Sequence, residues 1–320
     1  MDTPTALELY RVMRRIRRFE QRSTTLFGEN KIWGTIHSYA GQEAIAAGVC
    51  AHLRDDDWIT STHRGHGHCV AKHGDLGRMF AELLGRETGY CRGRGGSMHI
   101  ADTSKGNLGA NGIVGGGIPI ATGAALTAQQ RGTDQVAVSF FGDGAANQGT
   151  FHESLNMAAI WKLPVVYVCE VNGYAESLPI ERAFAIPDIS KRADSYGMPG
   201  VRVDGQDPRA VYDAAGIAIA RARTGGGPTL IVAEAYRLEG HYYGDPQLYR
   251  QKGEVEDWRA QHDPLVIARQ WMEQDKLASA AELDRIDAAV EAEIEAGVAF
   301  AEASPLASPL SLPEEIYASH

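Results

Sequence analysis

The chain has 320 residues, a hydrophobic content of 44% and a formal net charge of −10 at pH 7. This length accommodates one large α/β domain or two smaller domains. Because binding to a phosphate backbone requires a basic protein face, the acidic balance argues against nucleic acid as a partner.

The cysteines and the N-terminus bear on the cellular location. The four cysteines, at positions 50, 69, 91 and 169, have no CxxC spacing, which fits reduced thiols better than a disulfide framework. Residues 1–8 are polar and lack an apolar signal core, and no run approaches the roughly 18 apolar residues that a membrane span needs. We therefore expect a cytoplasmic protein with no membrane segment.

The N-terminal part of the chain predicts two helices. Residues 5–27 have apolar side chains at helical spacing, and residues 41–50 form a helix of small residues that packs closely against a neighbour. The first helix also carries a basic cluster, which we interpret as a solvated or interface face. Its members are Arg14, Arg15, Arg17 and Arg18.

Residues 60–69 (TSTHRGHGHC) crowd three histidines and Arg64 between glycines, which favours an irregular loop over a regular element. A zinc site is conceivable there, but histidines separated by glycines lack the helix or knuckle geometry that fixes metal ligands. An anion-binding or catalytic loop is the better interpretation, because Arg64 offers a planar fork for phosphate. We expect His68 and His73 to be surface or loop histidines.

Glycine-rich segments follow this loop. A short helix is expected over residues 76–84, ended by Gly85, and then a basic glycine loop over residues 89–99. The run 108–117 leads into a small-residue helix over 118–130. Such a run places backbone groups close to a ligand, although the same glycines also permit simple helix packing.

The second half of the chain alternates strands and helices. One strand ends at Phe141 and a second near Glu170, with a helix that starts near Asn147 between them. The elements expected next are a short helix over 189–197, a helix over 208–224 and a strand over 228–236. This alternation predicts an α/β fold in which helices flank both faces of a parallel sheet.

The C-terminal part predicts a helical extension. It consists of helices over 264–274 and 279–301, followed by a proline-rich tail. Ser279 and Glu282 form the capping-box pattern that opens the second helix. Because the chain has no internal repeat and no low-complexity linker, we expect a single domain over residues 1–320.

Polar side chains follow two successive predicted strands. Asp143 comes after the first and Asn172 after the second, and ligands of open parallel sheets bind beyond the carboxyl ends of the strands. A carboxylate and an amide oxygen suit Mg²⁺, while Gly142 and Gly144 let the backbone and the next helix N-terminus approach a diphosphate. If the GDG sequence stood alone, we would interpret Asp143 as a capping residue in a glycine turn. The presence of Asn172 after the next strand favours a binding site for a metal ion and a phosphate group instead.

The pair of GDG at 142–144 and Asn172 resembles the thiamine diphosphate signature. From Leu7 onward the chain is similar to the alpha subunit of the first component of 2-oxo acid dehydrogenase complexes, which implies the thiamine diphosphate-binding fold. The motifs that carry this resemblance are GQEA (41–44), HRGHGH (63–68), GRGGSMH (93–99), NGIVG (111–115), GDGAANQG (142–149), NMAAIWKLP (156–164) and the pattern GHxxGDP (240–246).

The resemblance also implies a set of site residues. Asp143 and Asn172 correspond to the Mg²⁺ ligands, together with the backbone carbonyl of Tyr174. Catalytic roles fall to His37, His66 and His241. The positions implied to contact the cofactor are His63, Arg64, Gly112, Val114, Asp143, Gly144, Ala145, Asn172 and His241.

The resemblance further implies partners and a substrate. Phrases such as STHRGHGHC and NGYAE are most similar to acetoin dehydrogenase alpha subunits, which implies cleavage of acetoin or a related 2-oxo compound. The family pairs this chain with a beta subunit in an α2β2 heterotetramer. That beta subunit supplies the glutamate that activates the cofactor pyrimidine, and a lipoyl-bearing acyltransferase accepts the acyl unit.

Three alternatives stay open. The first is a pyruvate or other 2-oxo acid dehydrogenase alpha subunit, and the second is a carboligase without a lipoyl partner. The third is a non-catalytic scaffold, which would not need all four of the polar residues Arg64, His66, Asp143 and Asn172. Two positions depart from the family pattern. Val171 replaces the first of two asparagines, and Glu239 leaves the substrate specificity open.

Overall fold

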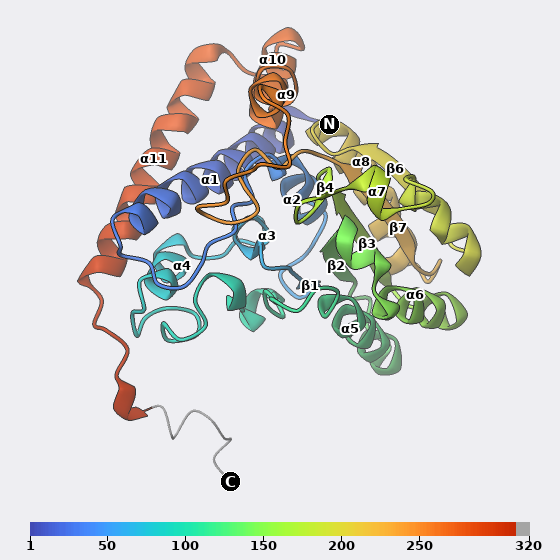
Figure 1. Cartoon of the computed structure of the whole chain (residues 1–320). Coiled ribbons are helices and arrows are strands. Elements are labelled where there is room, and N and C mark those ends of the chain that lie inside the picture. The colour runs from blue at the N-terminus through green and yellow to red at the C-terminus, as the bar shows by residue number, and fades with distance from the viewer. Residues whose placement is uncertain (312–320) are drawn as a thin grey trace.

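The protein is built on a parallel five-stranded sheet, seen in a computed structural model that describes residues 1–311 (Figure 1). The strand order is β1-β2-β3-β7-β6, and all four pairings are parallel. The strands are β1 (Trp58–Thr60), β2 (Ala137–Gly142), β3 (Val165–Val171), β6 (Gly200–Asp204) and β7 (Thr229–Glu234), and a separate hairpin joins β4 (Tyr174–Ala175) to β5 (Leu178–Pro179).

Both faces of the sheet are buried, and the alternation of side chains assigns each residue to one face. On β2, Val138 and Phe140 join the larger apolar cluster, which includes helices α1 and α2. Ala137 and Phe141, one position away, join a second cluster with α5 and α6. The predicted α/β fold, a parallel sheet flanked by helices, is therefore confirmed.

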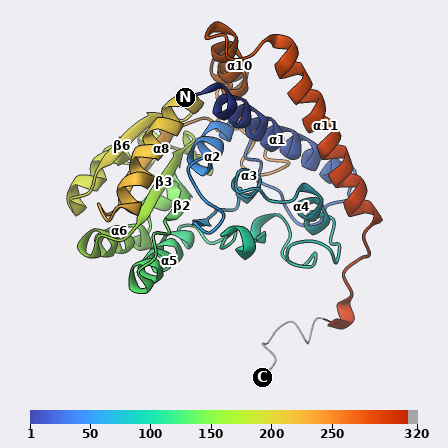
Figure 2. The same ribbon diagram turned by 180° about the vertical axis from the view of Figure 1, so that it is seen from behind.

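The helices enclose the sheet on both sides, as the two opposite views show (Figures 1 and 2). They are α1 (Thr3–Gly28), α2 (Glu43–Cys50), α3 (Gly65–Ala71), α4 (Leu76–Leu83), α5 (Gly117–Arg131), α6 (Gly149–Trp161), α7 (Ile180–Ala183), α8 (Pro208–Arg223), α9 (Glu254–His262), α10 (Pro264–Gln274) and α11 (Ala280–Ala303). Within residues 1–311, none of them is both long enough and apolar enough to cross a membrane.

Most predicted elements match the structure to within a few residues. The capping box at the start of α11 is present, because the Ser279 and Glu282 side chains each bond the other's backbone. The residues after Asp143 first form a 3-10 turn, and α6 begins at Gly149. Strands β1 and β6, the hairpin β4–β5 and helices α7 and α9 were not predicted. The single domain over residues 1–320 stays a prediction, and residues 312–320 of its proline-rich tail lie outside the described residues.

The prediction of an irregular stretch over residues 60–69 was wrong for its second half, whereas residues 61–64 form neither helix nor strand. Its second half is the start of helix α3, and every residue of that helix is buried. A Cβ on Gly67 would lie 2.1 Å from the Tyr39 ring, so the glycine is there for close packing. His68 is likewise not a surface histidine: it is fully buried, and its ring contacts Ser61 and Glu170 at 2.7 and 3.1 Å.

The basic cluster on α1 is an interface with another helix of the chain and not a solvated face. Helix α11 runs alongside α1 (Figures 1 and 2), and its carboxylates pair with the arginines. These pairs are Arg14–Asp287, Arg15–Glu293 and Arg18–Glu291, at 2.7, 3.0 and 2.6 Å. Arg17 is buried instead, and its guanidinium donates to Glu43 and Asp263. The cluster thus joins helices that are far apart in the sequence.

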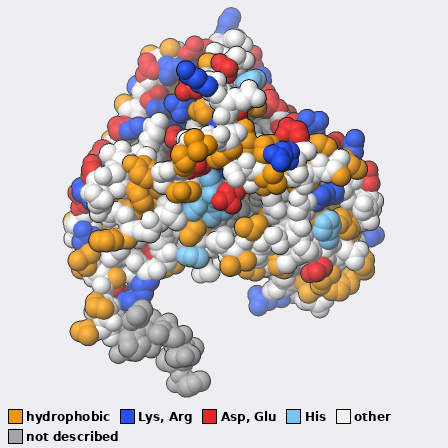
Figure 3. All heavy atoms as spheres, in the orientation of Figure 1, with side chains coloured by type: hydrophobic (Ala, Val, Ile, Leu, Met, Phe, Trp, Pro, Cys, Tyr) orange, Lys and Arg blue, Asp and Glu red, His pale blue; other side chains and the backbone are white. Residues whose placement is uncertain are grey.

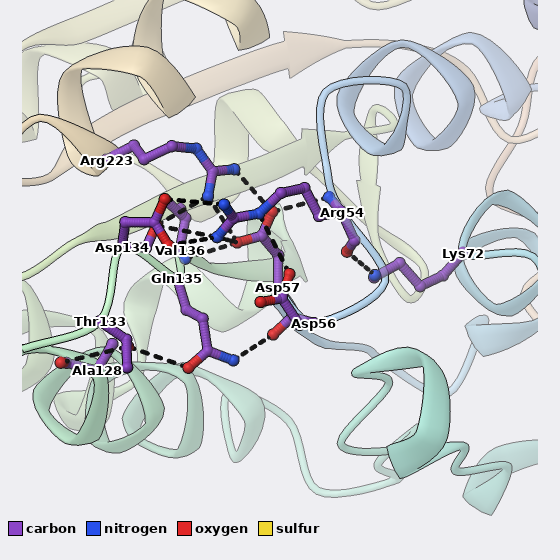
Figure 4. Close-up of polar contacts among 10 residues, drawn as sticks. All are labelled: Arg54, Asp56, Asp57, Lys72, Ala128, Thr133, Asp134, Gln135, Val136 and Arg223. Atoms are coloured by element: carbon purple, nitrogen blue, oxygen red, sulfur yellow. Dashed lines mark hydrogen bonds and ion pairs between the residues drawn. The ribbon is translucent and has the colours of Figure 1, made fainter. Parts of the chain in front are cut away.

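At the amino edge of the sheet, one buried carboxylate ties three segments together (Figure 4). Asp57 is fully buried and accepts two hydrogen bonds from the Arg223 guanidinium, at 3.0 and 2.7 Å. It also accepts the backbone N–H groups of Val136 and Arg54, each at 2.8 Å. The carboxylate therefore fixes β1 and β2 to the end of α8.

Asp57→Ala should destabilise the protein by about 3–5 kcal/mol, because it leaves a guanidinium and two backbone N–H groups without their buried acceptor. The matched control is Asp56→Ala, which removes an exposed carboxylate that pairs with Arg54 at 3.2 Å. This control should cost less than about 1 kcal/mol. Urea denaturation measures both, and equal losses would show that Asp57 does not have this role.

Candidate functional site

A cavity of about 360 Å³ opens at the carboxyl edge of the sheet, opposite Asp57. Histidine side chains gather near the middle of the face that Figure 3 presents. The cavity brings together residues from distant parts of the chain. Those predicted from the sequence that line it are His37, His63, Arg64, Gly112, Val114, Asp143, Gly144, Ala145, Asn172, Tyr174 and His241.

The parallel register of β2 and β3 places Asp143 beside Asn172. Gly142 pairs with Glu170, so both polar residues follow the ends of neighbouring strands. One Asp143 oxygen accepts the Gly144 N–H at 2.8 Å, while the other is buried without a hydrogen-bond partner among the described residues. Burial raises the pKa of Asp143 to about 6. A cation at this oxygen would relieve that penalty.

Asn172 lines the same cavity as Asp143. Its NH₂ group donates to the Gln42 side chain at 3.3 Å, and its Oδ1 lies 3.5 Å from the Tyr174 N–H. The Tyr174 hydroxyl donates to Glu254 at 2.8 Å, so its side chain is engaged away from this corner. Asp143, Asn172 and Tyr174 all line the cavity, and a carboxylate, an amide oxygen and a backbone carbonyl are hard oxygen donors of the kind that suits Mg²⁺. No group of three His, Cys, Asp or Glu side chains within residues 1–311 forms an alternative metal site.

Backbone groups beside Asp143 leave room for a ligand. A Cβ built on Gly142 would meet nothing within 4 Å, and Gly142 lines the cavity. A Cβ on Gly144 would lie 3.1 Å from that of Ala175, so the hairpin β4–β5 restricts this position. Asp143, Gly144 and Ala145 belong to the 3-10 turn Asp143–Asn147, and all three line the cavity.

Two buried guanidiniums form the cationic wall of the cavity. Arg64 donates to the backbone carbonyls of Ser38 and His241 at 2.7 and 2.8 Å, and burial, followed by repulsion from Arg237, lowers its pKa to about 9. Arg237 donates to the Tyr249 hydroxyl at 2.6 Å, and its Nε has no partner within the described chain. Neither has a carboxylate hydrogen-bonded to it among residues 1–311, so both favour an anionic ligand.

Arg237 was missed in the sequence because it follows the expected strand and belongs to none of the motifs that carry the family resemblance. Its proximity to Arg64 depends on strand β7 and the loop after it, which spacing alone does not reveal.

Three histidines meet at the cavity wall. The His37 ring lies 4.8 Å from that of His63 and 5.1 Å from that of His241, centroid to centroid. Burial, with the positive charge of Arg64, lowers the pKa of His37 to about 3, of His63 to about 2 and of His241 to about 4. All three are therefore neutral imidazoles at neutral pH.

The structure does not bring His66 to the cavity. Its two ring nitrogens lie 3.2 Å from Glu20 and 2.9 Å from Ser97, and all three side chains are buried. With both nitrogens engaged, His66 cannot reach a substrate. The predicted catalytic role of His66 therefore lacks the geometry that it requires.

Val171 and Glu239, the two positions that depart from the family pattern, both lie where their side chains are compatible with their neighbours. Val171 packs in the second apolar cluster, where an aliphatic side chain suits its neighbours. Glu239 does not line the main cavity; it lines a smaller hollow of about 170 Å³ and lies 3.7 Å from Arg259. It therefore places no negative charge in the cavity that contains Arg64 and Arg237.

The neutral imidazoles predict how stability depends on pH. An unfolded histidine has a pKa of about 6.5, so between about pH 4 and 6.5 these three histidines bind more protons in the unfolded chain than in the folded one. Their contribution to the free energy of unfolding should therefore decrease as the pH falls through this window. His63→Gln removes one such group and should reduce the slope by about 1 kcal/mol per pH unit.

Urea titrations at several pH values between about 7 and 5 test this expectation. The control is His73→Asn, at an exposed histidine with φ of 62° that asparagine tolerates, and it should leave the slope unchanged. An unaltered slope in His63→Gln would mean that this imidazole titrates normally in the folded protein.

Comparison with known proteins supplies the family. Residues 11–310 match the family model described as "Dehydrogenase E1 component". The chain is 59% identical over 249 residues to the alpha subunit of acetoin:2,6-dichlorophenolindophenol oxidoreductase of Bacillus subtilis, covering 78% of this chain and 75% of the relative. It is 51% identical over 292 residues to the subunit of the same name in Cupriavidus necator, covering 91% and 88%. It is 43% identical over 284 residues to the pyruvate dehydrogenase E1 component subunit alpha of Rhizobium meliloti, covering 89% and 82%. The chain therefore belongs to the dehydrogenase E1 component family.

Proposed function

We propose that this protein is the alpha subunit of a thiamine diphosphate- and Mg²⁺-dependent oxidoreductase that cleaves acetoin. The observation that carries the proposal is the charge arrangement in one cavity. An unpartnered Asp143 oxygen lies beside Asn172, and two guanidiniums without carboxylate partners among the described residues stand in the same wall. A magnesium diphosphate offers a cation to the first pair and an anion to the second.

The choice of acetoin rests on the relatives. Those named for acetoin oxidation are 59% and 51% identical to this chain, whereas the pyruvate dehydrogenase subunit of Rhizobium meliloti is 43% identical. The cavity is compatible with an uncharged substrate, because Arg64 and Arg237 are assigned to the diphosphate. The pyruvate dehydrogenase and carboligase alternatives have no comparable support.

In this proposal the chain's own residues bind and orient. Asp143, Asn172 and the Tyr174 carbonyl hold Mg²⁺, and Arg64 binds the diphosphate, with Gly144 and Ala145 close to it. When bound, thiamine diphosphate supplies the nucleophilic carbon that adds to a carbonyl and accepts the electrons of the broken carbon–carbon bond.

The histidines serve the substrate side of the cavity. His37 Nδ1 and His63 Nε2 are buried without partners in the described part of the chain, and both rings are neutral at neutral pH. A neutral ring nitrogen can accept a hydrogen bond from the hydroxyl group of acetoin and so orient the substrate. His241 Nδ1, 3.1 Å from Arg64, is held in place by that guanidinium.

A beta subunit completes the proposed site. Gly112 and Val114 face the pyrimidine ring, and the glutamate that activates this ring comes from the beta subunit of an α2β2 heterotetramer. Two apolar side chains at the cavity rim support a covering partner: Ile113 is 73% exposed and Val114 is 53% exposed. A lipoyl-bearing acyltransferase is the proposed acyl acceptor, and the cytoplasmic location stays a prediction from the sequence.

Asp143→Ala should weaken binding of magnesium thiamine diphosphate by more than about 100-fold, since changes to outer-shell groups alone cost 10–100-fold. Calorimetry on the complex with the beta subunit measures this. The control is Asp213→Ala, which removes an exposed carboxylate of α8 and should bind as the unmodified protein does. Unchanged affinity in Asp143→Ala would refute the metal assignment.

The alpha chain alone should not reduce dichlorophenolindophenol with acetoin as donor, and addition of the beta subunit should restore the reaction. The reason is that the pyrimidine-activating glutamate is assigned to the partner. A complex that contains the Asp143→Ala chain is the negative control. Turnover by the isolated alpha chain would contradict a divided active site.

A further inference from the structure

The loop Gly89–His99 is folded around one buried carboxylate. Glu82 projects from α4, is 1% exposed and accepts four backbone N–H groups of this loop. The donors are Cys91, Gly93, Gly95 and Gly96, at 2.7, 2.9, 2.7 and 3.0 Å. The loop has little regular structure, so this carboxylate accepts the backbone N–H groups that a helix or strand would otherwise pair with carbonyl groups.

A second anchor ties the same loop to helix α1 through His66. The Ser97 hydroxyl lies 2.9 Å from His66 Nε2, and His66 Nδ1 lies 3.2 Å from Glu20. With Glu20 as a carboxylate, which only accepts, Nδ1 carries the proton and Nε2 accepts from Ser97. Glu20 and His66 are each 1% exposed and Ser97 is 5% exposed, so water does not compete for these bonds.

The loop carries its next residue onto the cavity. Met98 follows Ser97 directly and lines the cavity together with Gly112. A Cβ on Gly112 would lie 3.9 Å from the Met98 sulfur, which places the two loops in contact. The loop Gly89–His99 therefore supports the part of the cavity that is assigned to the pyrimidine ring, away from the Asp143 corner.

We propose that His66 is a positioning residue for the ring-binding half of the cavity. Through Ser97 it holds Met98, and thereby the loop around Gly112, at the distance that the cofactor ring requires. The inference rests on the proposed function for the identity of the ring. It assigns a task to a histidine that lies outside the cavity and contacts no ligand.

Two substitutions separate the two hydrogen bonds of the ring. His66→Asn retains a donor near the Nδ1 position and loses the acceptor for Ser97, whereas the longer side chain of His66→Gln places an oxygen near the Nε2 position. Ser97→Ala removes the same bond from the loop side by deleting one hydroxyl, so it keeps the test available if His66→Asn does not assemble.

The experiment compares two probes by calorimetry on the complex with the beta subunit. Magnesium thiamine diphosphate engages both halves of the cavity, whereas magnesium pyrophosphate engages only the Asp143 corner. His66→Asn and Ser97→Ala should bind the thiamine compound about 10-fold or more weakly and bind pyrophosphate within about twofold of the unmodified protein. His66→Gln should recover most of the affinity for the thiamine compound that His66→Asn loses. Asp143→Ala should weaken the binding of both probes.

Three results would overturn the inference. Equal losses for both probes in His66→Asn and Ser97→Ala would indicate a general structural role. Unchanged affinity for both probes in these variants would show that the Ser97 bond positions nothing. Failure of the unmodified complex to bind either probe would instead reject the proposed function, and this inference with it.

Discussion

The site depends on charge that is buried without a counter-charge. Asp143 and the two guanidiniums of Arg64 and Arg237 lie in one cavity, yet no hydrogen bond or ion pair joins the carboxylate to either arginine among the described residues. The shifted pKa values of Asp143 and Arg64 express the cost of this arrangement. The rest of the fold holds these groups in place. The sheet, which is buried on both faces, sets the register of β2 and β3, and Asp57 fixes the opposite edge of the sheet through its pair with Arg223.

The fold and the metal corner were predictable because both depend on local patterns. Alternating apolar strands and helices indicate a parallel sheet, and in such a sheet the ends of successive strands meet. The order of the residues alone therefore indicates that Asp143 and Asn172 lie together. The bounds of α5, α8 and α10 were also predicted to within one residue.

What the sequence did not reveal depends on contacts between distant segments. Gly65 and Gly67 argue against a helix by propensity, yet α3 forms because Ala110 and Tyr39 pack where their side chains would be. The arginines of α1 find their carboxylates on α11, more than half the chain away. His66 shared a motif with cavity residues, but its position in α3 directs it toward Glu20 and Ser97.

The loop that contains Ile113 and Val114 belongs to two surfaces at once. Its backbone lines the cavity, and its apolar side chains project from the rim, where they are largely exposed. Where another protein strengthens ligand binding by burying this rim, reciprocity requires the ligand to strengthen that protein association by the same factor. Occupancy of the cavity and assembly of the enzyme would thus be a single coupled equilibrium, in which scarcity of the cofactor loosens the complex itself.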